Sequence, residues 1–178
     1  KASVGSYLDL LNFKANHRKI VMNESQALIT SANLTHDGSS LHSNIGFVVQ
    51  GGILTDIYES EKAVAALSGV SLPDVPFKSD TTEGELEVKL ITEGQIKAAM
   101  LQALTAANEQ STVKIGVFYI ADRDIVKALK DAAARGANIQ MILDPNKDAF
   151  GIEKNGIPNR QVAAELMKED NIEVRWYD

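Results

Sequence analysis

Residues 113–143 decide the fold class, and they read VKIGVFYIADRDIVKALKDAAARGANIQMIL. The apolar run Val113–Ile120 predicts a strand of the kind found in sheets that are covered on both faces. A helix follows, with Asp124 as its expected cap and Gly136 just past its end. Its expected buried stripe comprises Ile125, Ala128, Leu129, Ala132 and Ala133. Together with a second strand at Ile139–Leu143, the stretch predicts parallel strands with a helix packed on them.

The same alternation continues on either side of this stretch. A short strand is expected at Val88–Ile91, and residues 96–107 have apolar side chains at helical spacing. After a polar loop, Val162–Met167 predicts a helix and Ile172–Tyr177 a last strand. The chain is therefore expected to be an α/β protein with a mixed, mostly parallel β-sheet flanked by helices.

The first 68 residues have a different pattern, with short strands that follow one another directly. The expected elements are an extended segment at Tyr7–Phe13, a hairpin of Lys19–Asn23 and Ala27–Thr30, a third strand at Asn44–Gln50 and a helix at residues 54–67.

A linker is expected between these two patterns. Residues 69–85 contain Pro, Gly, Asp, Ser and Thr at the density typical of connecting segments. We therefore divide the chain into residues 1–68, the linker 69–85 and residues 86–178.

Composition excludes several kinds of chemistry. The chain of 178 residues has no cysteine, so it has no disulfide, thiolate metal site or cysteine nucleophile. Its net charge of −6 argues against nucleic acid as a partner, because phosphate neutralisation needs clustered Lys and Arg. No apolar run approaches the roughly 20 residues that cross a bilayer. The cellular location stays open, including membrane association of a parent protein.

His17 lies among cations, beside Arg18 and Lys19 and near Lys14. In a strand, the side chains of His17 and Lys19 point to the same face. Cations around one imidazole are unfavourable unless an anion binds there, and they keep the imidazole neutral and nucleophilic at neutral pH. Such a histidine can attack phosphorus while Lys19 neutralises the phosphate oxygens. The alternative is a surface strand with alternating basic residues.

Ser31 and Asn33 alternate at the end of the second strand of the hairpin. Both side chains are therefore expected to point where those of His17 and Lys19 point. The four groups together suit phosphate chemistry without a metal, and no metal or other cofactor is expected. The alternative is ordinary turn chemistry, in which Ser and Asn are common.

These residues resemble the HKD motif of the phospholipase D superfamily. That motif reads H-x-K, four residues, D, about six residues, G-S-x-N, and residues 17–19 (HRK) and 28–35 (LITSANLT) carry the likeness. The resemblance implies that His17 is the nucleophile or general acid and that Lys19 and Asn33 hold the phosphate. The expected further substrate contacts are Ser31, Arg18 and Lys14.

The chain also departs from the motif. Glu24 stands in the place of the aspartate, the hairpin is one residue shorter, and Thr30 replaces the usual glycine. Asn44 stands where many members have an acidic residue that orients an active-site histidine. An amide could still bind the imidazole but would stabilise its charged form less. Glu24 and Asn44 are expected to support the site without touching the substrate.

The second half of the chain resembles the same superfamily. Residues 113–146 look like the opening strand–helix–strand of a phospholipase D repeat, and residues 155–178 look like the stretch that leads to a second H-x-K strand. The chain is thus expected to be a fragment with the back half of one repeat followed by the front half of the next. Either the halves pack as one circularly permuted repeat, or they belong to different domains of a parent protein.

The resemblance implies phosphodiester hydrolysis or transphosphatidylation through a phosphohistidine, with a phospholipid as the favoured substrate. The alternatives are a nuclease-type phosphodiesterase on the same fold and a non-catalytic fragment that binds phosphate. The implied mechanism uses two histidines, and this chain supplies one. Its expected partner is a second copy of the chain or the missing H-x-K half, and the isolated monomer is expected to be inactive.

Overall fold

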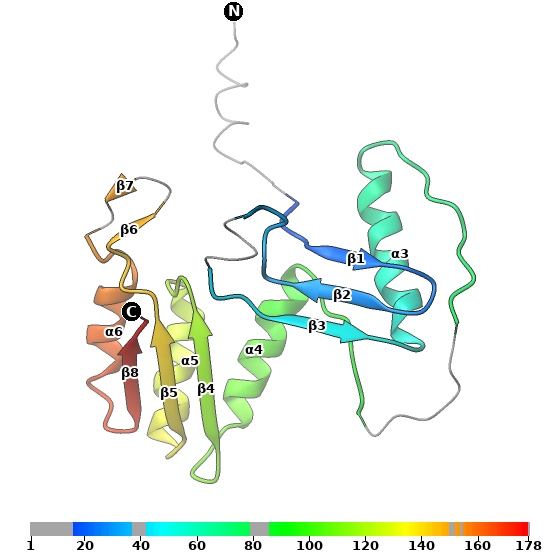
Figure 1. Cartoon of the computed structure of the whole chain (residues 1–178). Coiled ribbons are helices and arrows are strands. Elements are labelled where there is room, and N and C mark those ends of the chain that lie inside the picture. Colours follow the sequence, from blue (N-terminus) through cyan, green and yellow to red (C-terminus); the bar gives the residue numbers. More distant parts are fainter. Residues whose placement is uncertain (1–15, 37–41, 79–85, 150–151, 154, 178) are drawn as a thin grey trace, which may run out of the picture. The chain divides into compact units, whose positions relative to one another are not determined.

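The computed structural model describes residues 16–36, 42–78, 86–149, 152–153 and 155–177. The chain divides into two compact units, Lys1–Leu90 and Ile91–Asp178 (Figure 1). Each unit has a three-stranded sheet of its own. The segment expected at Tyr7–Phe13 lies outside the described residues.

The first unit is an antiparallel sheet with one helix. Its elements are β1 (Ile20–Met22), β2 (Ala27–Thr30), β3 (Gly46–Val49) and α3 (Ile53–Ala66), in the sheet order β1-β2-β3. The predicted hairpin, third strand and helix are confirmed. The side chain of Asn23 closes the hairpin turn, because its Oδ1 accepts hydrogen bonds from the backbone N–H groups of Ser25 at 2.9 Å and Gln26 at 3.0 Å.

Among the described residues of this unit, only one face of the sheet is covered. Ala27 on β2 and Leu54 and Ile57 on α3 are fully buried between the sheet and the helix. Val21, Leu28 and Val48 are paired across β1, β2 and β3 and alternate away from that core. They remain 52%, 36% and 65% exposed.

Part of the expected linker packs against the first unit. The ring of Phe77 lies edge-on to that of Tyr58, with centroids 5.2 Å apart, and the Tyr58 hydroxyl donates to the carbonyl oxygen of Pro73 at 2.6 Å. Leu90 contacts the same core. The predicted strand at Val88–Ile91 is wrong: these residues are irregular, because no neighbouring strand pairs with them.

The second unit is a parallel sheet with helices. Its main elements are α4 (Gly94–Ala106), β4 (Thr112–Val117), α5 (Arg123–Ala134), β5 (Asn138–Leu143), α6 (Asn159–Leu166) and β8 (Ile172–Trp176). The strands pair in the order β4-β5-β8, and both pairings are parallel. The loop between β5 and α6 carries a small antiparallel pair, β6 (Asp148–Ala149) and β7 (Ile152–Glu153). An α/β architecture with a parallel sheet is therefore confirmed for this unit, whereas a circularly permuted repeat stays a prediction.

All three helices of this unit lie on one side of its sheet (Figure 1). They enclose the larger core, whose fully buried members include Val126, Leu129, Ile139 and Leu143. The opposite face of the sheet is not covered within the described part of the unit. The expectation from Val113–Ile120 that both faces are covered is therefore not met by this unit.

The ends of α5 follow from its flanking residues. The cap is Asp122, not the expected Asp124: the Asp122 carboxylate accepts from the backbone N–H groups of Asp124 at 3.0 Å and Ile125 at 3.2 Å. Gly136 has a φ of +91° just past the helix, as predicted.

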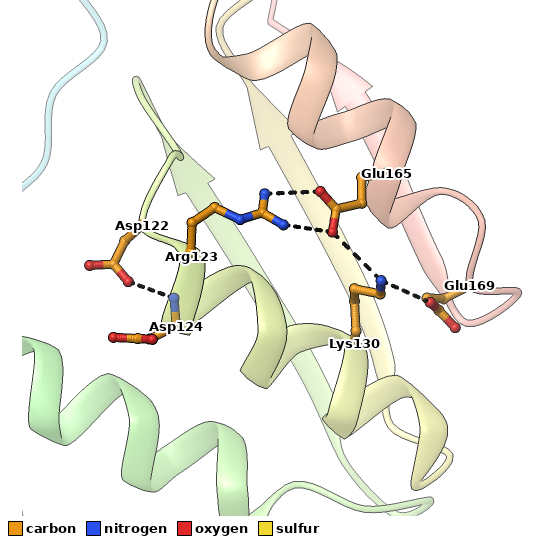
Figure 2. A network of polar contacts seen from close by, with 6 residues as sticks. All are labelled: Asp122, Arg123, Asp124, Lys130, Glu165 and Glu169. Carbon is orange, nitrogen blue, oxygen red and sulfur yellow. Dashed lines mark hydrogen bonds and ion pairs between the residues drawn. The ribbon is translucent and has the colours of Figure 1, made fainter.

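Side-chain ion pairs fasten α5 to α6 on the outside of the unit (Figure 2). The guanidinium of Arg123 donates to both oxygens of Glu165 at 2.9 Å and lowers the pKa of that carboxyl. Lys130 lies 3.6 Å from Glu165 and 3.9 Å from Glu169. Since these groups are substantially exposed, their contribution to stability is modest.

Candidate functional site

The hairpin of the first unit places His17 and Lys19 immediately before β1. The backbone N–H of Thr30 donates to the carbonyl oxygen of Lys19 at 3.1 Å, so the ladder of β1 and β2 extends to Lys19. The Lys19 ammonium donates to the backbone carbonyl of His17 at 2.8 Å, and the His17 side chain is exposed. Because the two residues alternate with Val21, they lie on the outer face of the sheet.

Arg18 points to the other face, toward the helix. Its Nη1 donates to the Ser60 hydroxyl at 2.8 Å and forms an ion pair with Glu61 at 3.0 Å, both on α3. The two side chains of the ion pair are 20% and 25% exposed. The structure therefore shows Arg18 joining the hairpin to α3, a role that the basic cluster in the sequence did not indicate.

Ser31 and Asn44 are brought together at the carboxyl end of β2, the end that lies beside Lys19. The Ser31 hydroxyl donates to the Asn44 side-chain oxygen at 2.9 Å and accepts from the backbone N–H of Ile45 at 3.0 Å. The Asn44 amide donates to the carbonyl oxygen of His42 at 3.1 Å. Ser31 thus holds the segment that enters β3.

Asn33 is exposed, and among the described residues no hydrogen bond joins it to the side chains of His17 or Lys19. The register of β1 and β2 explains why alternation alone does not place the side chains of Ser31 and Asn33 on the face of Lys19. Thr30 is the residue opposite Lys19, so Ser31 falls one step out of phase with it. The bend that begins at Ser31 then ends the strand. Convergence of His17, Lys19 and Asn33 on one phosphate stays a prediction.

Glu24 lies at the turn, at the opposite end of β1 from Lys19. Glu24 is five positions after Lys19 in the chain, a step of up to about 16 Å along extended backbone. Its backbone carbonyl accepts from the N–H of Lys78 at 2.9 Å. Glu24 is therefore not brought to His17, because the strand carries it away. Lys14, the other expected substrate contact, lies outside the described residues.

No group of three or more metal-ligating side chains gathers within residues 16–36, 42–78, 86–149 and the described residues that follow them. The expectation of metal-free chemistry stays a prediction. None of the helices in the described part of the chain is long and apolar enough to cross a membrane.

The sequence analysis missed a buried polar network in the second unit. The side chain of Asn159 is fully buried; its amide donates to the carbonyl oxygens of Phe118 at 2.8 Å and Asp144 at 2.9 Å, and its oxygen accepts from the N–H of Ile120 at 2.9 Å. Asn146 is also fully buried, and its oxygen accepts from the backbone N–H of Asn159 at 3.1 Å. The network holds the loops that follow β4 and β5 at the carboxyl edge of the sheet, where ligand sites of α/β sheets lie. In the sequence, Asn159 directly after Pro158 indicates the start of a helix, and nothing near it indicates a buried network.

One family model matches most of the second unit. Residues 100–178 match the family model described as cardiolipin synthase, PLD-like domain. No curated protein matches the chain.

Proposed function

Through residues 100–178 the chain belongs to the phospholipase D superfamily, and on that basis we propose that its His17–Lys19 hairpin is one half of a phosphodiesterase active site. The family match supports phosphodiester chemistry on phospholipids at the level of the family. The assignment to the hairpin is supported by the position of His17 and Lys19 directly before β1, where the Thr30 N–H bonds the Lys19 carbonyl oxygen, and by the ion pair that holds Arg18 at α3.

In the proposed reaction, a ring nitrogen of His17 attacks phosphorus and displaces the alcohol. The P–O bond to the leaving alcohol breaks as the P–N bond forms, and a second histidine donates a proton to the leaving oxygen. Water, or an acceptor alcohol in transphosphatidylation, then gives up a proton to that second histidine and attacks the phosphorus of the phosphohistidine, so that the P–N bond breaks as the new P–O bond forms. This releases the phosphate product and restores His17. Lys19 stabilises the charge on the non-bridging oxygens throughout.

The second histidine of this mechanism must come from outside the hairpin of this chain. A second copy of the chain, or an H-x-K strand from a longer parent protein, would supply it. The proposed assignment of residues 1–68 and 86–178 to consecutive half repeats accounts for the single H-x-K strand. The isolated monomer is accordingly expected to be inactive.

A non-catalytic fragment that binds phosphate is the second candidate. It is favoured by the exposed His17 and by the engagement of Arg18 with Glu61, which leaves fewer cations for substrate. The two candidates differ in turnover and share phosphate binding.

The deciding experiment measures turnover by the chain, and by a parent protein with a second H-x-K strand, on three substrates: a chromogenic phosphodiester, phosphatidylcholine vesicles and single-stranded DNA. His17→Ala should reduce the rate about 1,000-fold or more, whereas His42→Ala, the same change at an exposed loop histidine, should leave it unchanged. Acid-labile phosphate on protein quenched during turnover would identify the intermediate. Turnover that is unaffected by His17→Ala would overturn the proposal, and a preference for DNA would favour the nuclease.

A further inference from the structure

A chemically labile pair of residues lies in the loop between β7 and α6. Asn155–Gly156 is the only Asn-Gly pair in the sequence. Asparagine is among the thermolabile residues of proteins, and it is most labile before glycine, because no side chain hinders the glycine nitrogen. That nitrogen can attack the asparagine side chain and expel ammonia. The phosphodiesterase chemistry proposed above makes no use of this pair.

The backbone of the loop requires this pair. Asn155 has a φ of +52° and Gly156 a φ of +84°, which match the two central positions of a type I′ turn, where Asn-Gly is the preferred pair. A side-chain carbon at Gly156 would also collide with the side chain of Arg160. A bulkier residue that would slow the reaction therefore cannot replace Gly156 without strain. The loop thus keeps a reactive pair at a position that its geometry fixes.

One hydrogen bond opposes the reaction. The backbone N–H of Gly156 donates to the backbone carbonyl oxygen of Asn146 at 2.7 Å, and both residues are buried. The nucleophile is the amide anion that forms when this N–H loses its proton. A carbonyl oxygen at this distance stabilises the N–H and would repel the anion. Ring closure would also leave the buried Asn146 carbonyl without this donor.

The acceptor itself is held in place by the buried network described above. The side chain of Asn146 accepts from the backbone N–H of Asn159 at 3.1 Å and donates to the carboxylate of Asp144 at 3.0 Å. The backbone N–H of Asn146 donates to the same carboxylate oxygen at 2.7 Å. Asn146 is therefore fixed through both its backbone and its side chain, and its carbonyl keeps facing Gly156 while the network is intact.

We propose that Asn155–Gly156 is a deamidation site that the buried Asn146–Asn159 network keeps closed. When the loop opens, the Gly156 nitrogen gives its proton to hydroxide and attacks Cγ of Asn155. The bond from Cγ to Nδ2 breaks as the new C–N bond forms, and ammonia leaves with a proton taken from water. Water then opens the cyclic imide: attack at Cγ gives aspartate, and attack at the backbone carbonyl carbon gives isoaspartate. The net change is the exchange of ammonia for water.

The modification would in turn release the network. Isoaspartate inserts an extra carbon into the backbone between Asn155 and Gly156, which displaces the Gly156 N–H from the Asn146 carbonyl. Each modified molecule is therefore expected to have a less stable second unit, and refolding does not reverse the change. The inference rests on the second unit alone and does not depend on the proposed phosphodiesterase activity.

The proposal is tested by peptide mapping of the full chain during incubation at mildly alkaline pH and 37 °C. The readout is the mass increase at Asn155 that results when a hydroxyl replaces the side-chain amino group. A synthetic peptide of residues 151–160 is the unprotected reference. Deamidation at Asn155 should be at least about tenfold slower in the folded chain than in the peptide, because the reaction waits for local opening. Equal rates would overturn the proposal.

Asn146→Gly tests the role of the network. The variant removes the side-chain contacts of Asn146, and glycine keeps the φ of +49° without strain. Deamidation at Asn155 should become about fivefold faster or more. Asn171→Ala, which removes one hydrogen bond to Ala133, is the control and should leave the rate unchanged. An unchanged rate in Asn146→Gly, or an equal acceleration in Asn171→Ala, would sink the idea. Far-UV circular dichroism shows whether each variant is folded.

Hydrogen exchange gives a measurement that needs no variant. The amide proton of Gly156 in the full chain should exchange at least about tenfold more slowly than in the reference peptide, because it is held by the Asn146 carbonyl. Exchange at the rate of the peptide would contradict the proposal, whatever the variants show.

Discussion

Arg18 and Glu61, 43 residues apart in the chain, form an ion pair of 3.0 Å between the start of the hairpin and α3. Because the pair draws Arg18 to the helix-covered face of the sheet, His17 and Lys19 on either side of it are left on the outer face. The ion pair therefore sets which of the three consecutive basic side chains are available to a phosphate.

Replacing Arg18 tests this division of roles. Arg18→Ala should lower the free energy of unfolding by about 1–2 kcal/mol, because it removes a partly buried ion pair and a hydrogen bond to Ser60. Lys78→Ala, an exposed basic residue of the same unit, should change it by less than about 0.5 kcal/mol. The measurement is urea unfolding. Phosphodiesterase activity per folded molecule should change less than about threefold; a much larger loss would return Arg18 to the substrate contacts.

The buried network in the second unit predicts a large loss of stability for Asn159→Ala. The variant leaves the carbonyl oxygens of Phe118 and Asp144 and the N–H of Ile120 without this partner, in a region that water does not reach. The expected cost is about 2–4 kcal/mol, measured by urea unfolding of the second unit. Asn171→Ala, which removes one hydrogen bond from an exposed side chain to Ala133, is the matched control and should cost about 1 kcal/mol. Equal losses of stability in the two variants would contradict the conclusion that this network holds the loops after β4 and β5 in place.

Asp122 should make the second unit sensitive to acid. The hydrogen bond from Lys97, together with those from the backbone of Ile125 and Asp124, lowers the pKa of Asp122 below its ordinary value of 3.8. A carboxyl with a lower pKa in the folded state stabilises the fold above its unfolded pKa. That stabilisation is lost as pH falls through the lowered folded pKa.

The free energy of unfolding of this unit should therefore decrease below about pH 4, and Asp122→Asn should flatten the decrease while keeping an N-cap acceptor. Asp122→Ala should be less stable than Asp122→Asn at every pH, because it also removes the cap. Urea unfolding from pH 2 to pH 7 measures both effects. Asp170→Asn, an exposed carboxylate, is the control; an identical flattening there would contradict the role of Asp122.

Phosphodiesterase activity should survive removal of divalent ions. The proposed chemistry uses His17 and Lys19, and neither requires a metal to act on phosphorus. Activity of an assembled two-histidine form should stay within about twofold after dialysis against EDTA. Loss of activity that zinc or calcium restores would contradict this expectation.

Local patterns in the sequence were sufficient for most elements and for the family. The apolar spacing of residues 113–143 predicted β4, α5 and β5, because the hydrophobic side of each element is determined by residues close together in the chain. Gly136 was predicted at a helix end for the same local reason, since only glycine adopts its φ without strain. The resemblance of residues 113–146 and 155–178 to the superfamily was likewise readable, and the family match of residues 100–178 supports it.

The candidate site was harder to predict, because it depends on register. Whether Ser31 lies in phase with Lys19 is decided by which residues pair across β1 and β2, and a shift of one residue reverses every side chain. The length of the Asn23 turn sets that pairing, and the sequence does not reveal it.

What the sequence by itself determined is the alternation of strands and helices, the H-x-K pattern and the resemblance to the superfamily, since all of these depend on neighbouring residues. Only the tertiary structure decided that Arg18 joins α3, that Asn159 is buried under the loops after β4 and β5, and that the described helices of the second unit lie on one face of its parallel sheet. Each of these is a relation between residues about 40 positions apart or on different strands, and such relations arise from packing, which no local pattern encodes.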